Sequence, residues 1–366
     1  MSLKSLLLLA LHSTAMANRL PPRIDVHSHF LPPDYHTALV ENGHEKVDGM
    51  PAIPPWSVEA HLEMMEINNV SKSILSISSP GTHIVPGKDA LGKNLTRHCN
   101  SYAAGLKKKY PDKFGFWASL PLPDVEAALE EIDKAVEEGC DGFAMLTNYH
   151  GNYMGASALD PVLKKLNEIG ATVFIHPTKP CIKHGAEVSS ANTTDALPFG
   201  DQYPIPMFEF LFDTARSFIN LFLTGTVERC PNITFIIPHV GGAMPPIYTR
   251  FISFAAVVPG GRVFDPKDIR RQLDHQFYFD LAGLAFDGET GGDGQLKAFV
   301  KGFDISYQRL LYGSDFPFTK TQFVKQFADR MKDGLEDLFD ECERDAIYEK
   351  NAIKLLEDGA EKRAKL

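Results

Sequence analysis

Short apolar segments rich in β-branched and aromatic residues recur along the chain and alternate with amphipathic stretches. Most are bounded by turn residues, and each has the length of a buried strand. Continuous apolar runs are typical of parallel strands that are covered on both faces. We predict eight strands: Ile24–His29, Ser73–Ser78, Gly115–Leu120, Gly142–Thr147, Thr172–His176, Thr234–His239, Phe277–Leu281 and Leu310–Asp315.

Between these strands, apolar residues recur at helical spacing. The clearest predicted helices are Val58–Asn68, Leu91–Tyr110, Val125–Glu138, Pro161–Ile169 and Phe208–Arg229. Eight strands that alternate with helices favour a closed (β/α)8 barrel, although a doubly wound parallel sheet fits the same order of elements.

The predicted barrel occupies residues 23–332, with residues 1–22 as an N-terminal extension. Residues 333–366 read as a charged helical tail, for which the expected docking residues are Leu338, Ile347 and Leu355. A long segment rich in Pro, Gly, Ser, Thr and Asn, Pro177–Pro206, follows the fifth strand. Loops of this length are uncommon unless they are functional, so we expect it to cover the barrel mouth, with Pro32–Pro55 as a second wall.

Residues 1–17 bear on the cellular compartment. They combine an apolar run at 6–11 with the small-residue sequence Ala15-Met16-Ala17, as in a signal peptide. The run is short and is interrupted by His12 and Ser13, so we favour a docking helix in a cytoplasmic protein, with the secretory pathway as the alternative. No apolar run is long enough to span a bilayer, so no membrane partner is expected.

The composition, 44% hydrophobic and 23% charged, is that of a globular protein. A net charge of −10 without a clustered basic run argues against nucleic acid as a partner, because neutralising phosphates requires patches of Lys and Arg. The 5 cysteines are widely spaced and show no zinc-ribbon or redox motif, so we expect reduced, structural thiols.

The strongest candidate chemistry lies at the C-terminal ends of the predicted strands. The first strand ends in Asp25-Val26-His27-Ser28-His29, and residues two apart on a strand project from the same face. Three further strands end in residues of the same kind, namely His176, His239 and Asp315. Active sites of (β/α)8 barrels are built at these strand ends. The four strands that end in histidine or aspartate therefore indicate a site for a divalent metal.

These motifs resemble the non-oxidative decarboxylases of the amidohydrolase superfamily, through Asp-x-His-x-His, His-Pro, Pro-His-Val-Gly-Gly and Gly-Ser-Asp-Phe-Pro. The similarity runs from about Arg23 to Leu356 and is particularly high to fungal 6-methylsalicylate decarboxylases. The branch also includes aminocarboxymuconate semialdehyde, γ-resorcylate and isoorotate decarboxylases. The resemblance implies an amidohydrolase-type TIM barrel that holds one metal ion through His27, His29, His176 and Asp315.

Such a nitrogen-rich ligand set favours Zn²⁺, with Mn²⁺ as the alternative. The resemblance places His239 beside the metal as an acid/base or positioning group, and its alternative is a fourth imidazole ligand. Hydrolases of the superfamily often bridge two metals with a carboxylated Lys on strand four, but here Gly142–Asn148 contains no Lys. This favours a lyase over a hydrolase that opens a lactone or amide. An intact ligand set disfavours a non-catalytic binding barrel.

The resemblance also bears on substrate binding. It implies that Arg250 reaches into the neighbouring subunit of a homodimer and holds the substrate carboxylate, with a surface ion pair as the alternative. A second substrate-binding Arg, expected after strand one, has no counterpart in residues 45–55, which favours a small aromatic monoacid. The candidates for apolar walls of the pocket are Trp117, Phe318, Phe316 and Phe208.

Loss of CO2 directly from an arene would leave an unstabilised carbanion, so the ring carbon must be protonated first. An ortho-hydroxy acid can chelate a metal through two oxygens, and Asp315 would then protonate the carboxyl-bearing carbon. The preferred reaction is 6-methylsalicylate to m-cresol, with isoorotate, dihydroxybenzoate and resorcylate as alternative substrates. Isoorotate needs polar partners for its ring N–H and C=O groups, and the sequence assigns none.

Overall fold

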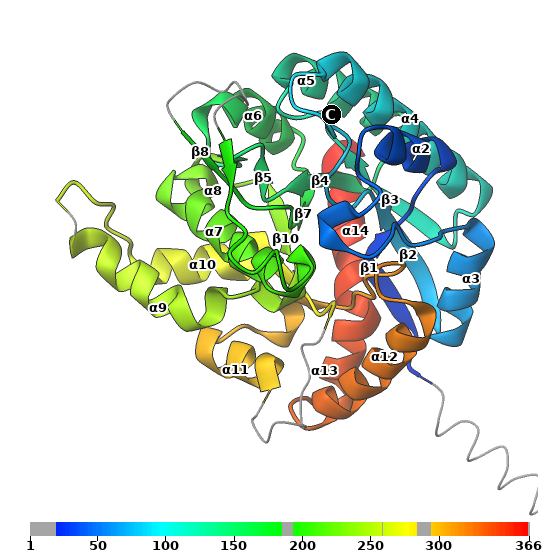
Figure 1. Ribbon diagram of the computed structural model, residues 1–366. Helices are drawn as coiled ribbons and strands as arrows, with labels where there is room; N and C mark the ends of the chain where they lie inside the picture. The colour runs from blue at the N-terminus through cyan, green and yellow to red at the C-terminus, as the bar shows by residue number, and fades with distance from the viewer. Residues whose placement is uncertain (1–19, 185–192, 258, 284–293, 365–366) are drawn as a thin grey trace, which may run out of the picture.

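The computed structural model describes residues 20–184, 193–257, 259–283 and 294–364, so the predicted docking segment 1–17 lies outside the described residues. A parallel sheet of 8 strands, in the order β1-β2-β3-β4-β7-β10-β11-β12, forms the centre of the molecule (Figure 1). All eight predicted strands are confirmed: β1 (Arg23–His29), β2 (Val70–Ser76), β3 (Phe114–Ser119), β4 (Gly142–Leu146), β7 (Thr172–His176), β10 (Thr234–Ile237), β11 (Phe277–Asp280) and β12 (Leu310–Leu311).

Backbone hydrogen bonds between β1 and the segment after β12 close this sheet. The amide of Val26 donates to Tyr312 O at 3.1 Å, and the amide of Asp315 donates to His27 O at 2.8 Å. An open doubly wound sheet would leave both edge strands unpaired, whereas here the first strand bonds to the segment that directly follows the last strand. The (β/α)8 barrel is therefore confirmed.

Side chains fill the barrel interior, as in other barrels of this class. The inward-facing cluster consists of Ile24, Val26, Ile74, Trp117, Ala144, Phe174, Ile236, Tyr278 and Leu311. The C-terminal helix α14 (Asn351–Ala364) adds Ala352 and Leu355 to the same cluster. Its Arg363 also donates to Asp141 O, just before β4, at 3.0 Å. Helix α14 therefore closes the end of the barrel at which the strands begin.

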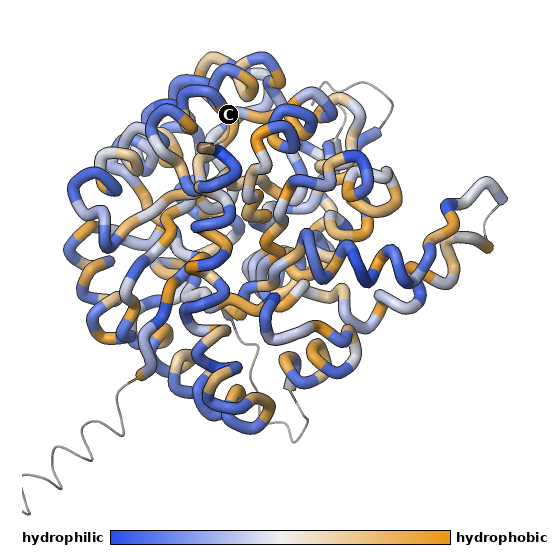
Figure 2. The backbone as a smooth tube through the Cα atoms, turned by 180° about the vertical axis from the view of Figure 1, so that it is seen from behind, coloured by the Kyte–Doolittle hydropathy of each residue, from blue (hydrophilic) through white to orange (hydrophobic). Residues whose placement is uncertain are grey.

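Helices surround the barrel, and their hydrophilic and hydrophobic positions alternate along the outer tube (Figure 2). They are α2 (Pro33–Glu41), α3 (Val58–Ile67), α4 (Asp89–Lys109), α5 (Val125–Glu137), α6 (Asp160–Glu168), α7 (Glu209–Leu223), α8 (Thr226–Arg229), α9 (Met244–Phe254), α10 (Pro266–Gln276), α11 (Gly294–Phe303), α12 (Thr321–Glu336) and α13 (Glu341–Asp345). The single helix expected over 208–229 is wrong, because Gly225 (φ 74°) separates α7 from α8. Helix α12 runs past residue 333, where the tail was expected to begin.

The loops at the opposite end of the barrel contain further short elements. The segment expected to cover the mouth includes β8 (Cys181–Lys183), which pairs antiparallel with β9 (Thr193–Asp195), and the turn η4 (Ile205–Met207). The loop after β1 contains α2 and the turn η1 (Val47–Gly49). A second small hairpin, β5 (Asn148–Tyr149) with β6 (Asn152–Tyr153), follows β4. Within the described part of the chain, every helix is too short or too polar to cross a membrane.

The contact between α14 and the barrel interior gives a stability prediction. Leu355 is 3% exposed within the interior cluster, whereas Ile353 on the same helix is 38% exposed. We expect Leu355→Ala to lower the free energy of unfolding by about 2–5 kcal/mol, because it removes buried contacts and leaves a cavity. The matched substitution Ile353→Ala should change it by less than about 0.5 kcal/mol. Urea unfolding followed by circular dichroism measures both, and equal effects would contradict this role of α14.

Candidate metal centre and substrate cavity

Three histidines meet where the barrel strands end. His27 and His29 lie on β1, and His176 is the last residue of β7. All three side chains are buried, and one possible ligand atom of each lies within 4.8 Å of the others. The two-residue spacing on β1 therefore directs both imidazoles to one point, as predicted.

Hydrogen bonds at Nδ1 orient all three rings. The partners are Asp280 Oδ2 at 2.9 Å for His27, Ser76 Oγ at 2.9 Å for His29 and Pro177 O at 2.6 Å for His176. The Nε2 atoms of His27 and His29 are buried and make no hydrogen bond. Metal-binding histidines typically use one nitrogen for such a partner and the other for the ion. These orphaned nitrogens therefore fit a metal ion.

Asp315 brings a carboxylate to the same point. Its Oδ1 lies 3.2 Å from His29 Nε2 and 3.6 Å from His27 Nε2. Its backbone is left-handed, with φ 58°, in a turn beyond the end of β12. The buried carboxylate of Asp25 holds this turn, because the amide and hydroxyl of Ser314 donate to its two oxygens at 3.0 and 2.6 Å. The expectation that Asp315 lies on the strand itself is thus corrected.

His239 also lies in a left-handed turn, beyond the end of β10 rather than on it. Its φ is 51°, and Val240 follows with φ 56°. The turn packs tightly on α7, since a Cβ on Gly242 would lie 2.4 Å from Leu211 O. The His239 ring is half-buried, and its Nδ1 lies 3.2 Å from Ala282 O.

The ligand atoms of His239 group with those of His27 and Asp280, not with His29 and His176. This favours a position beside the three-histidine centre over a fourth ligand within it. Both groups of possible ligands were found among the residues that the structure describes. In the second group, Asp280 is the neighbour that His27 and His239 share.

The sequence motifs do not include Asp280, the last residue of β11. Its carboxylate accepts a hydrogen bond from His27 Nδ1 and from the backbone amides of His239 and Ala282, both at 3.1 Å. It thus links the first histidine of the metal centre to the turn after β10. The one available signal was a lone carboxylate at the end of the apolar strand Phe277–Asp280.

Burial and neighbouring charges set the protonation states. Burial lowers the pKa of His29, His176 and His239, which keeps these imidazoles neutral and able to bind a metal. Burial opposes charge on His27 too, but the Asp280 carboxylate outweighs it and raises the pKa. Burial also works against ionised Asp315, yet its close contact with His29 and the charges of His27, His29 and His239 prevail and lower its pKa. The centre therefore offers largely neutral imidazoles and an ionised carboxylate.

A cavity of about 120 Å³, here called the metal cavity, lies over these residues. Its walls are Asp48, Met50, Ser78, His176, Pro206, Phe210, His239, Asp315 and Phe318. Phe318 lines it as the sequence suggested, with its ring centroid 5.5 Å from that of His29. The two loops expected to form walls both contribute, through Met50 and Pro206.

The structure does not bring the other predicted pocket residues to this cavity. Trp117 lies in the barrel interior, where its Nε1 donates to Val26 O at 2.9 Å and its ring stacks on Phe174. Phe316 packs against His61 in the core, with ring centroids 5.0 Å apart. Neither ring is among the residues that line the metal cavity.

Two more predicted residues lie on the surface. Phe208 is 39% exposed and packs against other aromatic rings of the loop after β7. Arg250 is exposed on α9, on the flank of the molecule, with its guanidinium 4.6 Å from the Phe254 ring centroid (Figure 1). Arg250 is therefore absent from the cavity of its own chain.

Comparison with known proteins places this site in a family. The profile of the family described as Amidohydrolase matches residues 24–357. Decarboxylase yanB of Aspergillus niger is 34% identical over 345 residues, which cover 91% of this chain and 87% of the relative. The 6-methylsalicylic acid decarboxylase acuB of Aspergillus aculeatus is 32% identical over 329 residues, 86% of this chain and 92% of the relative.

Solved structures agree on the fold. A dihydroxybenzoic acid decarboxylase from Polaromonas, crystallised with bound manganese, aligns with a TM-score of 0.72 at 19% sequence identity. The alignment covers 92% of this chain and 97% of that one. At this identity the likeness supports the barrel architecture alone.

The geometry of the three histidines predicts one divalent metal ion per chain. We expect His176→Ala to lose the metal and the activity while the fold persists, because His176 lies above the barrel core. Elemental analysis of the purified protein and its thermal melting curve provide the measurements. His275→Ala, at an exposed histidine of α10, is the matched control and should retain the metal. Two metal ions per fully active chain would contradict a one-metal site.

Proposed function

The chain belongs to the amidohydrolase family, and from this premise we propose that it is a metal-dependent, non-oxidative decarboxylase of an ortho-hydroxy aromatic acid. The observation that carries the proposal is the convergence of His27, His29, His176 and Asp315 beneath a small cavity that has both apolar and polar walls. Relatives that are 32–34% identical and carry decarboxylase names support this assignment.

The donor set suits a single divalent ion held by His27, His29, His176 and Asp315. Three imidazoles and one carboxylate favour Zn²⁺, whereas the manganese in the Polaromonas structure supports Mn²⁺ as the alternative. When bound, the ion would supply Lewis-acid polarisation of the substrate carboxylate and ortho oxygen.

Asp315 is the proposed proton-transfer group. Because its pKa is lowered, it is a carboxylate in the ligand-free protein and can take the proton of the ortho hydroxyl. It then delivers this proton to the carboxyl-bearing ring carbon, which becomes tetrahedral. The C–C bond breaks, CO2 leaves, and the electron pair restores the aromatic ring as a phenolate.

The other cavity residues position the acid. His239, in its left-handed turn, is the proposed second polar group beside the reacting carbon. Met50, Phe210 and Phe318 offer apolar surface to the ring and to an alkyl substituent, and they exclude water from the protonated intermediate. A methyl group next to the carboxylate is therefore the substituent that this pocket would favour.

We also propose a homodimer in which Arg250 acts on the partner's substrate. Arg250 is exposed on α9, where Ile247 and Phe254 are 37% and 52% exposed. Farther along, Val257 and Val263 are 70% and 77% exposed. Exposed apolar side chains gathered on one flank are typical of a subunit interface. A guanidinium on such a flank can reach a neighbouring cavity and pair with a carboxylate.

The dimer proposal predicts complementation. We expect Arg250→Ala and Asp315→Ala to be inactive alone and to recover part of the activity when mixed, because a hybrid dimer contains one site with both residues intact. Decarboxylation by mixtures of separately tagged subunits measures this. Absence of recovery, with subunit exchange shown by co-purification of the two tags, would count against action across the interface.

The substrate proposal predicts that 6-methylsalicylate is converted to m-cresol with a higher kcat/KM than salicylate, 2,3-dihydroxybenzoate or isoorotate. A methyl group in an apolar pocket contributes roughly 10–200-fold to specificity. The sequence assigned no polar partner to the ring N–H and C=O groups of isoorotate, whereas Asp48 and Ser78 line the cavity, so isoorotate is the comparison acid that tests the prediction most sharply. Steady-state CO2 release on the four acids is the measurement. Hydrolysis of a lactone without CO2 release would overturn the decarboxylase assignment itself.

A further inference from the structure

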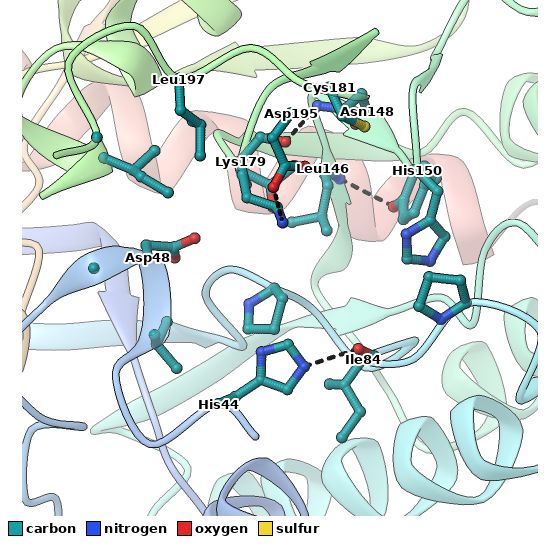
Figure 3. Close-up of a pocket in the computed structure, with 18 of the residues that line it drawn as sticks. His44, Asp48, Ile84, Leu146, Asn148, His150, Lys179, Cys181, Asp195 and Leu197 are labelled. Carbon is teal, nitrogen blue, oxygen red and sulfur yellow. Dashed lines mark hydrogen bonds and ion pairs between the residues drawn. The ribbon is translucent and has the colours of Figure 1, made fainter. Parts of the chain in front are cut away.

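A second cavity of about 510 Å³, here called the outer cavity, is shown in Figure 3. The loops after β1, β2, β4 and β7 enclose it. Among the lining residues that the structure describes, Asp48 alone belongs to both cavities. Asp48 therefore lies between the metal cavity and the outer cavity.

The surrounding structure fixes the position of Asp48. It lies in η1 with a left-handed backbone, φ 52°. Gly49 follows with φ 73°, and a Cβ there would lie 3.6 Å from Pro204 Cα. The loop after β1 thus packs against the end of the long loop after β7. A non-glycine residue in this conformation, held by two loops, marks a built feature of the site.

The carboxylate of Asp48 points into the outer cavity (Figure 3). A hydrogen bond from the Ser79 hydroxyl and the charge of Lys179 favour its ionised form, while burial opposes it. The net effect raises the pKa of Asp48 to about 6, so the group is mainly a carboxylate at pH 7.5. Lys179 is itself paired with Asp195 at 2.8 Å.

The metal cavity has both polar and apolar lining residues. His176, His239 and Asp315 lie at the metal centre, and Met50, Pro206, Phe210 and Phe318 are apolar. Its remaining polar groups are Ser78 and Asp48. Asp48 lines the same cavity as His176, His239 and Asp315. At about 120 Å³, this cavity is far smaller than the roughly 300–1,000 Å³ of typical ligand pockets, so a ring bound at the metal centre fills much of the space that Asp48 borders.

We propose that Asp48 is a specificity-determining residue, whose carboxylate accepts a hydrogen bond from a hydroxyl on the ring edge opposite the substrate carboxylate. The proposal rests on the proposed decarboxylase function and narrows its substrate class. The favoured acids carry an ortho hydroxyl, a 6-methyl group and a further hydroxyl para to the carboxylate, as in 2,4-dihydroxy-6-methylbenzoate. A second carboxylate at that edge is repelled by the charge of Asp48.

The size of the effect follows from the free-energy cost of leaving a partly buried charge without a hydrogen-bond partner. An acid with only C–H groups on this edge removes water from Asp48 without replacing its hydrogen bond. A hydrogen bond to a charged group restores that loss and is stronger than one between neutral groups. We expect the para hydroxyl to raise kcat/KM by roughly 10–100-fold.

The test is the ratio of kcat/KM for 2,4-dihydroxy-6-methylbenzoate to that for 6-methylsalicylate, measured in each variant. Asp48→Asn removes the charge but keeps the shape, and Asn tolerates a left-handed backbone. We expect the ratio to fall at least several-fold in Asp48→Asn. Asp201→Asn, at an exposed residue that lines only the outer cavity, is the matched control and should leave the ratio unchanged.

A binding measurement separates this proposal from the proposed activity. Calorimetry should show that the product orcinol binds the wild type more tightly than m-cresol, and that Asp48→Asn loses this difference. If neither acid releases CO2 while the binding difference depends on Asp48, the decarboxylase assignment fails and the role of Asp48 stands. An equal ratio and equal binding difference in well-folded wild type and Asp48→Asn would overturn the role of Asp48.

Discussion

The contact between the first strand and the turn after the last strand is the constraint on which the site depends. The amide of Asp315 donates to His27 O, and Ser314 donates to both oxygens of Asp25. These bonds join segments 289 residues apart and close the barrel. The same bonds carry the Asp315 carboxylate to the histidines of β1. Barrel closure and completion of the ligand set are therefore one event in this protein.

The close approach at this contact explains the residues around it. A Cβ on Gly313 would lie 2.8 Å from His27 Cβ, so only glycine lets the last segment lie against β1. Asp315, His239 and Val240 all adopt left-handed backbone conformations, which are costly for residues with a Cβ. The packed barrel and α7 hold these turns in place. Such strained positions cluster at active sites and ligand-binding sites.

The features that the sequence predicted are those that depend on the local spacing of apolar and polar residues. Eight apolar runs identified the strands, and alternation on β1 directed His27 and His29 to one point. The alternation of side chains along a strand does not show whether an inward-facing side chain lies at the barrel mouth or deeper in the barrel interior. Trp117 was therefore assigned to the pocket, although it fills the barrel interior. Asp280 was missed because a single buried carboxylate forms no motif. Its role exists only once β11 lies beside β10 and its oxygens meet His27.

Asp48 was beyond sequence reasoning for a different reason. Its position depends on the packing of η1 against Pro204 and Ile205, which lie more than 150 residues later in the chain. The two sides of the cavity thus have separate origins. Strand ends and their turns hold the metal centre, and the loops after β1 and β7 form the wall that faces the ring. Loops accept substitutions more readily than barrel strands. A barrel of this kind can therefore keep its decarboxylation chemistry while exchange of a few loop residues such as Asp48 changes the ring that it accepts.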